Sequence, residues 1–213
     1  MFLKLIRKII IGTVLFAFVP MIFSCSDSVP EISKVSYYVV FDFEEVDKNP
    51  SVSLSVFLQL NSEARRASKM VVSKDSSDYS WIIETPEIFS SDDKNYVFAK
   101  NLRSDAMSPN FAGSYTVLYA DLTDNETEGK FVVAYDKRLV ESTSENALSF
   151  ARGAQKNIAV YNEKNEVIYF GKPKDSWSEP QKILENYNKA VSKRDVYFSA
   201  GSGVYILLPK ENL

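Results

Sequence analysis

The stretch "NFAGSYTVLYADLTDNETEGKFVVAYD", residues 110–136, contains two short runs in which every second residue is apolar or aromatic. The runs are Tyr115, Val117 and Tyr119, and then Phe131, Val133 and Tyr135. Strict alternation of this kind is typical of a β-strand with one buried face. Asp121–Gly129 lies between the runs and is polar, so the stretch predicts two strands joined by a hairpin loop.

The same alternation recurs upstream. Val35–Phe43 and Val52–Leu60 each carry an apolar residue at every second position, and the turn-forming residues Asp47–Pro50 separate them. Shorter runs predict strands around Tyr79–Glu84 and Tyr96–Phe98, and Met70–Val72 is a further candidate. Six or seven short strands at regular spacing predict a β-sandwich.

Gly113, Tyr115 and Val117 follow a Gly-x-Tyr-x-Val pattern ahead of a polar turn and a closing strand. Residues 32–137 thereby resemble immunoglobulin-like and fibronectin type III-like domains. The resemblance implies that Tyr115 is a corner tyrosine whose hydroxyl bonds to an upstream backbone group, and that Trp81 is the core tryptophan. The cysteine pair of antibody domains is absent, so only the looser family is implied.

Residues 138–213 show a different pattern. Ala147–Phe150 suggests one helical turn, and 158–170 predicts a hairpin. Ser178 and Gln181 resemble a capping box ahead of a predicted helix with an apolar face, and two strands are expected across Gly201–Gly203. The apolar face consists of Ile183, Leu184, Tyr187, Ala190 and Val191. The expected fold is therefore mostly β: an immunoglobulin-like β-sandwich over 32–137, followed by a small α+β unit of ββαββ type over 138–213.

The N-terminus has the composition of a secretory signal. Lys4, Arg7 and Lys8 precede 18 uncharged residues, Ile9–Ser26, and a polar chain follows. We interpret residues 1–24 as a signal peptide. The alternative is an uncleaved membrane anchor, because a spanning helix needs about 20 apolar residues.

Cys25 is the one cysteine of the chain and closes the sequence Ile22-Phe23-Ser24-Cys25. This sequence resembles the lipobox of bacterial lipoproteins, and the bulky Phe23 resembles the relaxed lipobox of spirochaete lipoproteins. The resemblance implies acylation of Cys25, a tether over 25–31, and a protein held by lipid at a membrane of the cell envelope. Several acyl chains anchor a protein stably, because each buried methylene contributes about 0.8 kcal/mol.

Composition excludes several kinds of chemistry. The chain has no histidine, so Ser-His-Asp catalysis and histidine-ligated zinc are excluded. Three of its 25 basic residues precede Cys25, so the mature chain has 22 basic and 28 acidic residues and a formal net charge of −6. This charge argues against nucleic acid as a partner, since that partner needs basic patches.

Two local sequences have residue types that occur in ligand sites. Asp121, Asp124, Glu126 and Glu128 crowd one turn and suit calcium chemically, but their spacing does not match an EF-hand loop, which favours a solvated turn. Gly201–Gly203 lacks the following helix of a phosphate cradle and is better interpreted as a turn. We therefore expect no catalytic residue, no metal and no cofactor.

The sequence thus predicts a non-catalytic binding or scaffolding module at the cell envelope, whose partner is an envelope or host protein. A structural or assembly component without a soluble ligand is the alternative, and an enzyme using carboxylates is a third class. A shallow aromatic groove would favour binding, a large flat apolar patch would favour assembly, and a deep pocket with two perturbed carboxylates would favour the enzyme.

Overall fold

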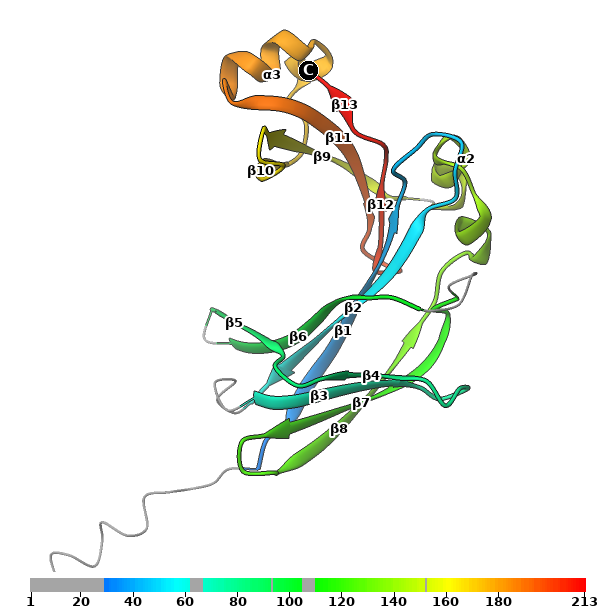
Figure 1. The fold of residues 1–213 in the computed structure, drawn as a ribbon, viewed down its shortest axis with the longest axis vertical. Helices are drawn as coiled ribbons and strands as arrows, with labels where there is room; N and C mark the ends of the chain where they lie inside the picture. Colours follow the sequence, from blue (N-terminus) through cyan, green and yellow to red (C-terminus); the bar gives the residue numbers. More distant parts are fainter. Residues whose placement is uncertain (1–28, 62–66, 93, 105–109, 152) are drawn as a thin grey trace, which may run out of the picture.

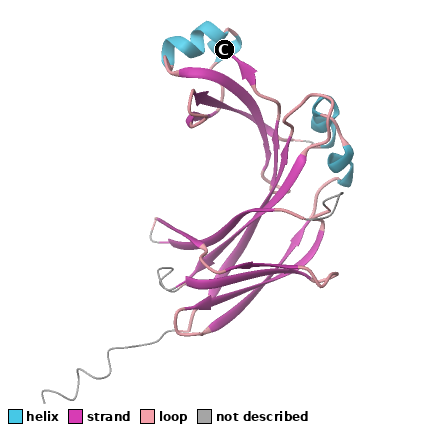
Figure 2. Ribbon diagram, in the orientation of Figure 1, coloured by secondary structure: helices cyan, strands magenta, loops and turns pink. Residues whose placement is uncertain are grey.

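The computed structural model describes residues 29–61, 67–92, 94–104, 110–151 and 153–213. Strands dominate, and the helices are short (Figures 1 and 2). The strands are β1 Ile32–Asp42, β2 Ser51–Leu60, β3 Ala67–Lys74, β4 Ser80–Ile83, β5 Glu87–Ser91, β6 Lys94–Leu102, β7 Gly113–Asp121, β8 Glu126–Val133, β9 Gln155–Asn162, β10 Val167–Gly171, β11 Ala190–Ser199, β12 Val204–Leu207 and β13 Glu211–Asn212. The helices are the 3₁₀ turns η3 Lys137–Glu141, η4 Leu148–Phe150 and η5 Asp175–Ser178, and the α-helices α2 Ser144–Ala147 and α3 Pro180–Asn186.

The strands form a nine-stranded mixed sheet and a four-stranded antiparallel sheet. The larger sheet has the order β10-β9-β11-β12-β1-β2-β6-β5, with β13 paired to β11, and the smaller has the order β4-β3-β7-β8. Figure 1 shows the larger sheet bending along the whole molecule, while the smaller sheet lies against its lower part. The expectation of a mostly β protein is confirmed, and within the described residues no second strand layer lies against one face of the larger sheet.

The alternating runs are the strands that the sequence predicts. β1, β2, β3, β4, β6, β7 and β8 cover them, and β5 is an edge strand that the sequence pattern did not reveal. The hairpin loop after β7 is shorter than expected, because β8 already begins at Glu126 and pairs Glu126 with Ala120. The expected loop over Asp121–Gly129 is thus a turn of four residues, 122–125.

The main core lies between the two sheets. It is built from the alternate residues that point inward from both layers, including Phe41, Leu54, Val72 and Val117, all fully buried. Tyr115 is also fully buried, and its hydroxyl donates a hydrogen bond of 2.9 Å to the carbonyl of Phe111, four residues upstream. This is the bond expected of a corner tyrosine. Burial, followed by the proximity of Tyr135, raises the pKa of Tyr115.

Trp81 is only partly buried, so its expected place in the centre of the core is corrected. β4 is an edge strand of the smaller sheet, and an edge position leaves one side of the indole open. The ring stacks on Phe111 at 5.9 Å and on Tyr115 at 6.5 Å between centroids. Its Nε1 donates a hydrogen bond of 2.7 Å to the carbonyl of Arg103.

These contacts predict different losses for two substitutions. Tyr115→Phe keeps the ring and removes one buried hydrogen bond, so the free energy of unfolding should fall by about 1–3 kcal/mol. Trp81→Ala should cost about 3 kcal/mol, the lower end for truncation of a large aromatic, because the indole is partly exposed. Urea unfolding of both variants measures the losses, and two variants as stable as the parent would contradict the packing described.

After η4 the chain continues in the order β9, β10, α3, β11, β12, which is the expected ββαββ order. These strands extend the larger sheet, because β12 lies parallel to β1 and pairs Val39 with Val204 through Asp42 with Leu207. On the same face of the sheet as the main core, α3 and η5 cover a second, smaller core of Ile158, Val160, Trp177, Ile183 and Ala190.

A buried arginine ties β11 to β1. Arg194 Nη2 contacts Asp42 Oδ1 at 2.6 Å, and Arg194 Nε donates a hydrogen bond of 2.8 Å to the carbonyl of Leu208. The guanidinium therefore reaches from β11 across the end of β12, where it bonds to Leu208, to Asp42 on β1. Its buried charge is compensated by Asp42 and by backbone carbonyls, as a buried charge must be.

The predicted helix in this region is wrong in length and cap. Helix α3 ends at Asn186, and Ala190 and Val191 belong to β11. Its N-cap is Glu179, without a side-chain hydrogen bond, so Ser178 does not form the capping box expected with Gln181. Pro180 supplies the first helical position instead, where its fixed φ angle favours helix initiation.

Candidate functional site: an aromatic groove

The face of the larger sheet opposite the main core carries a row of five aromatic rings, which we call the aromatic ladder. Its members come from five neighbouring strands: Phe198, Tyr205, Tyr38, Phe57 and Phe98, from β11, β12, β1, β2 and β6. Successive ring centroids lie 4.4, 5.4, 5.4 and 5.2 Å apart. All five side chains are intermediate in exposure, so they are accessible in part to a ligand.

Strand register explains the ladder. Phe198 lies opposite Tyr205, and Phe57 lies opposite Phe98, on antiparallel neighbours. Tyr38 is the diagonal neighbour of Phe57, because it pairs with Ser55 two residues away. Val39 and Val56, which follow and precede two of these residues, point into the main core, so the ladder residues point to the opposite face.

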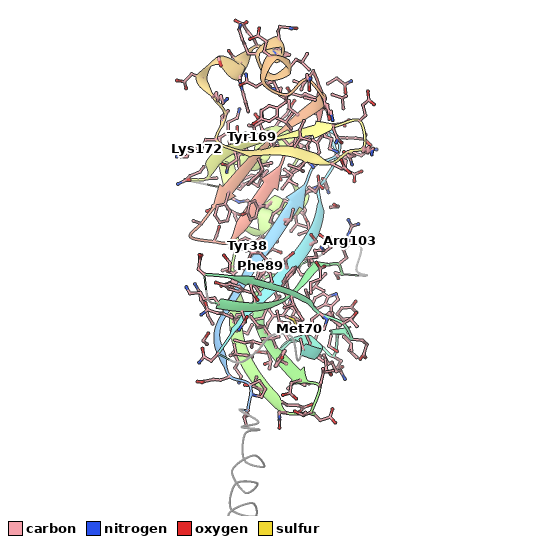
Figure 3. All side chains as sticks on the ribbon, turned by 90° about the vertical axis from the view of Figure 1, so that its left-hand side faces the viewer. Tyr38, Met70, Phe89, Arg103, Tyr169 and Lys172 are labelled. Atoms are coloured by element: carbon pink, nitrogen blue, oxygen red, sulfur yellow. The ribbon has the colours of Figure 1, made fainter. Side chains whose placement is uncertain are left out.

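One end of the ladder opens into a groove of about 550 Å³, which we call the aromatic groove. It crosses β1, β2, β6 and β5, and Figure 3 shows Tyr38 and Phe89 near the middle of this face. The β5 side chains Ile88 and Phe89 are 42% and 57% exposed. The lining comprises Lys34, Ser36, Tyr38, Phe57, Gln59, Ile88, Phe89, Ser91, Asp92, Tyr96 and Phe98.

The groove holds two opposite charges that do not neutralise each other. Lys34 is exposed on β1, and its ammonium group forms no ion pair or hydrogen bond with a described residue. Asp92 is exposed in the β5–β6 turn, accepts a hydrogen bond from Ser91, and has no ion pair within the described ranges. Between them lie aromatic rings, hydroxyl groups and one amide.

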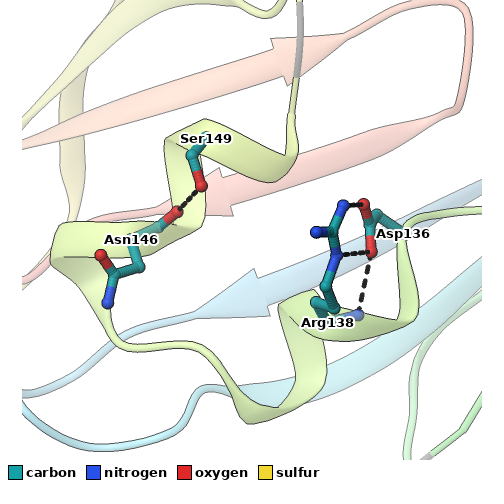
Figure 4. Close-up of polar contacts among 4 residues, drawn as sticks. All are labelled: Asp136, Arg138, Asn146 and Ser149. Carbon is teal, nitrogen blue, oxygen red and sulfur yellow. Dashed lines mark hydrogen bonds and ion pairs between the residues drawn. The ribbon is translucent and has the colours of Figure 1, made fainter.

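A second hollow, the junction pocket, has about 560 Å³ and lies between η3, η4 and the β11–β12 turn. Its charged groups are already paired with each other. Figure 4 shows Arg138 paired with Asp136, with Nη2 2.6 Å from Oδ2, and the hydroxyl of Ser149 donating to the carbonyl of Asn146. Arg138 also lies over the ring of Phe150. Since this cation is neutralised in place, the junction pocket is the weaker candidate.

The acidic turn predicted after β7 is organised around one carboxylate. Asp121 is 3% exposed and accepts hydrogen bonds from the backbone and side chains of Thr123 and Asn125. Burial raises the pKa of Asp121, but these hydrogen bonds outweigh it and lower the pKa below its usual value. The Asp121 carboxylate therefore stabilises the turn. In the described ranges, no group of three or more potential metal ligands occurs.

The remaining predicted sites are easily placed. Gly201–Gly203 is the turn between β11 and β12, as expected. Cys25 lies outside the described residues. Within them, the structure has no helix long and apolar enough to cross a membrane.

The sequence pattern did not single out the aromatic groove. Tyr38 and Phe57 occupy strand positions out of phase with the core, where β2 otherwise places serines and a glutamine. Their position in the alternation was the signal that could have revealed the groove, because the outward face of a strand usually carries polar residues and an aromatic residue there suggests a binding surface. The comparisons with known proteins add no further clue, because no family model, no curated protein and no solved structure matches this chain.

Proposed function

We propose that this protein is a lipid-anchored lipoprotein of the cell envelope that acts as a non-catalytic binding module, with the aromatic groove as its binding surface. The observation that carries the proposal is the groove itself. It exposes aromatic and aliphatic side chains on a sheet face that no second strand layer of the described chain covers.

The exposed apolar surface of the groove supports a binding function. Contiguous exposed apolar surface is costly in water, and it is a common mark of an interaction site. Clefts lined mainly by aromatic side chains with a few polar groups are the usual form of a binding site. Burying such surface yields about 25 cal/mol per Å².

An immunoglobulin-like scaffold is part of the proposal. It is supported by the two packed sheets and by the Tyr115 hydroxyl bonded to the Phe111 carbonyl. The ββαββ segment of 138–213 is proposed as a small α+β unit that extends the same sheet, with residues 25–31 as the tether to the anchor.

Acylation is tested at Cys25. Cys25→Ala should abolish metabolic labelling with palmitate and release the protein from membranes, because removing the acyl chains removes their buried methylenes. Labelling of the parent is the control. A variant that stays on membranes after a carbonate wash would support the uncleaved anchor instead.

The groove is tested by crosslinking in the native envelope. A photoreactive residue in place of Ser36, at the floor of the groove, should crosslink to a discrete partner. The double substitution Phe57→Ser with Phe98→Ser should abolish that product while Cys25 labelling persists. Ile82→Ser is the matched control, since Ile82 is 59% exposed on the other sheet.

The result also separates the rival functions. A crosslink that persists in the double variant means that the groove is not the binding surface. Crosslinks that appear only within one stable envelope complex would favour the structural or assembly role over recognition of a separate ligand.

A further inference from the structure

Strand β5 is an outer strand of the larger sheet that lacks the usual protection against pairing with another chain. Edge strands are commonly protected by charges, by a bulge or by being very short. The other three outer strands of the described sheets have such features: β8 carries three charged residues, β10 has a register shift, and β4 has four residues. β5 pairs with β6 without a register shift, and its charged residue, Glu87, lies at its start. Its Ile88 and Phe89 are exposed, and Figure 1 shows the β5–β6 hairpin projecting from the side of the molecule.

The hairpin register indicates which backbone groups of β5 face outward. Ser91 pairs with Lys94 at the β5–β6 turn, and the pair that closes a two-residue hairpin turn is a hydrogen-bonded pair. Hydrogen-bonded and non-hydrogen-bonded pairs alternate along an antiparallel ladder. Phe89 therefore bonds to β6, whereas the N–H and C=O groups of Ile88 and Ser90 point away from β6, toward the open edge.

These outward groups favour one register for a second copy of β5. Outward-facing residues must lie opposite each other, so Ile88 and Ser90 of one copy face Ser90 and Ile88 of the other, and Phe89 faces Phe89. Each copy then donates two hydrogen bonds and accepts two. Shifting the register by two residues brings Ser90 opposite Pro86, which has no N–H, or Ile88 opposite Asp92 in the turn.

The aromatic side chains agree with this register. Phe89 meets Phe89 of the second copy in a non-hydrogen-bonded pair, where opposite side chains are closest. Each of these rings has Tyr96 of its own chain on its other side, with 6.3 Å between the centroids. Aromatic pairs across neighbouring strands stabilise antiparallel sheets. Since Phe89 and Tyr96 line the aromatic groove, the pairing joins the grooves of the two copies through a row of four rings.

The charges near the ends of β5 are complementary as well. Glu87 lies opposite Ser91 of the second copy, and Lys94 of that copy is the next residue in the same row. Lys94 is exposed and has no ion pair with a described residue. Glu87 is bound by Lys100 of its own chain at 2.8 Å, but a carboxylate accepts more than one hydrogen bond. The short serine side chain leaves room for Lys94 to reach Glu87 across it.

We propose that two copies of this chain pair their β5 strands antiparallel, centred on Phe89, and so form one continuous sheet. The partner of this edge is a second copy because the backbone groups, the aromatic rings and the charges of β5 are complementary to themselves in a single register. The interface is one strand pair, which places it among the weak and transient associations. This inference goes beyond the proposed function and does not depend on it.

Disulfide formation at Phe89 tests the pairing in the full chain. Opposite residues of a non-hydrogen-bonded pair have Cα atoms about 4.5 Å apart, which is within the range for a disulfide. In envelope membranes under mild oxidation, Phe89→Cys should give a disulfide-linked dimer. The parent controls for Cys25, and Ile82→Cys, at an exposed position of the outer strand β4, controls for random collisions. Neither control should give the dimer.

Proline at position 90 separates edge pairing from the fold of the hairpin. The Ser90 N–H points outward, so Ser90→Pro removes a donor to the second copy and none to β6. Each dimer loses two hydrogen bonds, each worth about fivefold in the association constant, so Phe89→Cys with Ser90→Pro should dimerise about 25-fold less. Ser90→Ala keeps the N–H and is the matched control, which should crosslink like Phe89→Cys alone. Both Ser90 variants should unfold at the same urea concentration, because neither loses a backbone bond to β6.

Four results would overturn the inference: no dimer from Phe89→Cys, as much dimer from Ile82→Cys, equal dimer from the two Ser90 variants, or a crosslinked product that contains a different protein. The last result would mean that the β5 edge receives another chain. Failure here differs from failure of the proposed function. The Ser36 crosslink reports on the groove and not on the edge, because β2 and β6 separate β1 from β5.

Discussion

An isolated fragment of residues 138–213 is expected to give a poorly dispersed amide spectrum and no cooperative thermal transition. The fragment retains β9 to β13 but loses β1, so β12 becomes an edge strand that is paired only with β11. Arg194 loses Asp42, and an arginine buried without its counter-ion is strongly destabilising. What remains is the second core of five buried hydrophobic residues and a cluster of three more, Ala159, Tyr161 and Val196, which together are too small for a chain of this length to fold securely.

The full chain, measured under the same conditions, is the control for that experiment. A fragment that is well dispersed and melts cooperatively would establish 138–213 as an independent domain. In that case the β1–β12 pairing would be a contact between two domains, and its role in holding the fragment together would be disproved.

Gly203→Ala should lower the free energy of unfolding by about 2–4 kcal/mol, combining the cost of a left-handed backbone with that of overpacking. Gly203 has a φ of 63°, and an added Cβ would lie 2.7 Å from the carbonyl oxygen of Tyr37. The backbone of Gly203 and the backbone of β1 are held together at this point, because the carbonyl of Gly203 accepts a 2.8 Å hydrogen bond from the amide of Val39. Relief of the clash would therefore strain the pairing of β12 with β1.

Gly201 provides a matched control in the same turn. An added Cβ there meets no atom within 4 Å, so Gly201→Ala should change stability by less than about 0.5 kcal/mol. Urea unfolding should show a lower midpoint for Gly203→Ala with an unchanged slope. Equal midpoints for the two variants would show that the β11–β12 turn is not closely packed on β1.

The strands could be predicted where their residues alternate clearly. β1 and β2 have an apolar residue at every second position, and the structure forms both with matched register. The parallel pairing of β1 with β12 could not be predicted, because alternation fixes which face is buried and not which distant strand lies alongside.

The length of α3 and the presence of the groove are two further features that the sequence pattern could not predict. Ala190 and Val191 continue a helical spacing from Ile183, but they equally fit the start of a strand. They form the start of β11 because this strand pairs with β9 and β13. Tyr37 and Tyr38 are adjacent aromatic residues on opposite faces of β1, so composition alone does not separate the core residue from the groove residue.

The β1–β12 pairing also fixes an order of events during folding. Val39 of β1 pairs with Val204 of β12, so β1 leaves the ribosome long before β12 is synthesised. Contacts between segments so distant in sequence form slowly, because a long loop must close before they stabilise the chain. Until then one edge of β1 is open to pairing with other chains. We therefore expect truncation before Gly203 to cause aggregation of newly made protein.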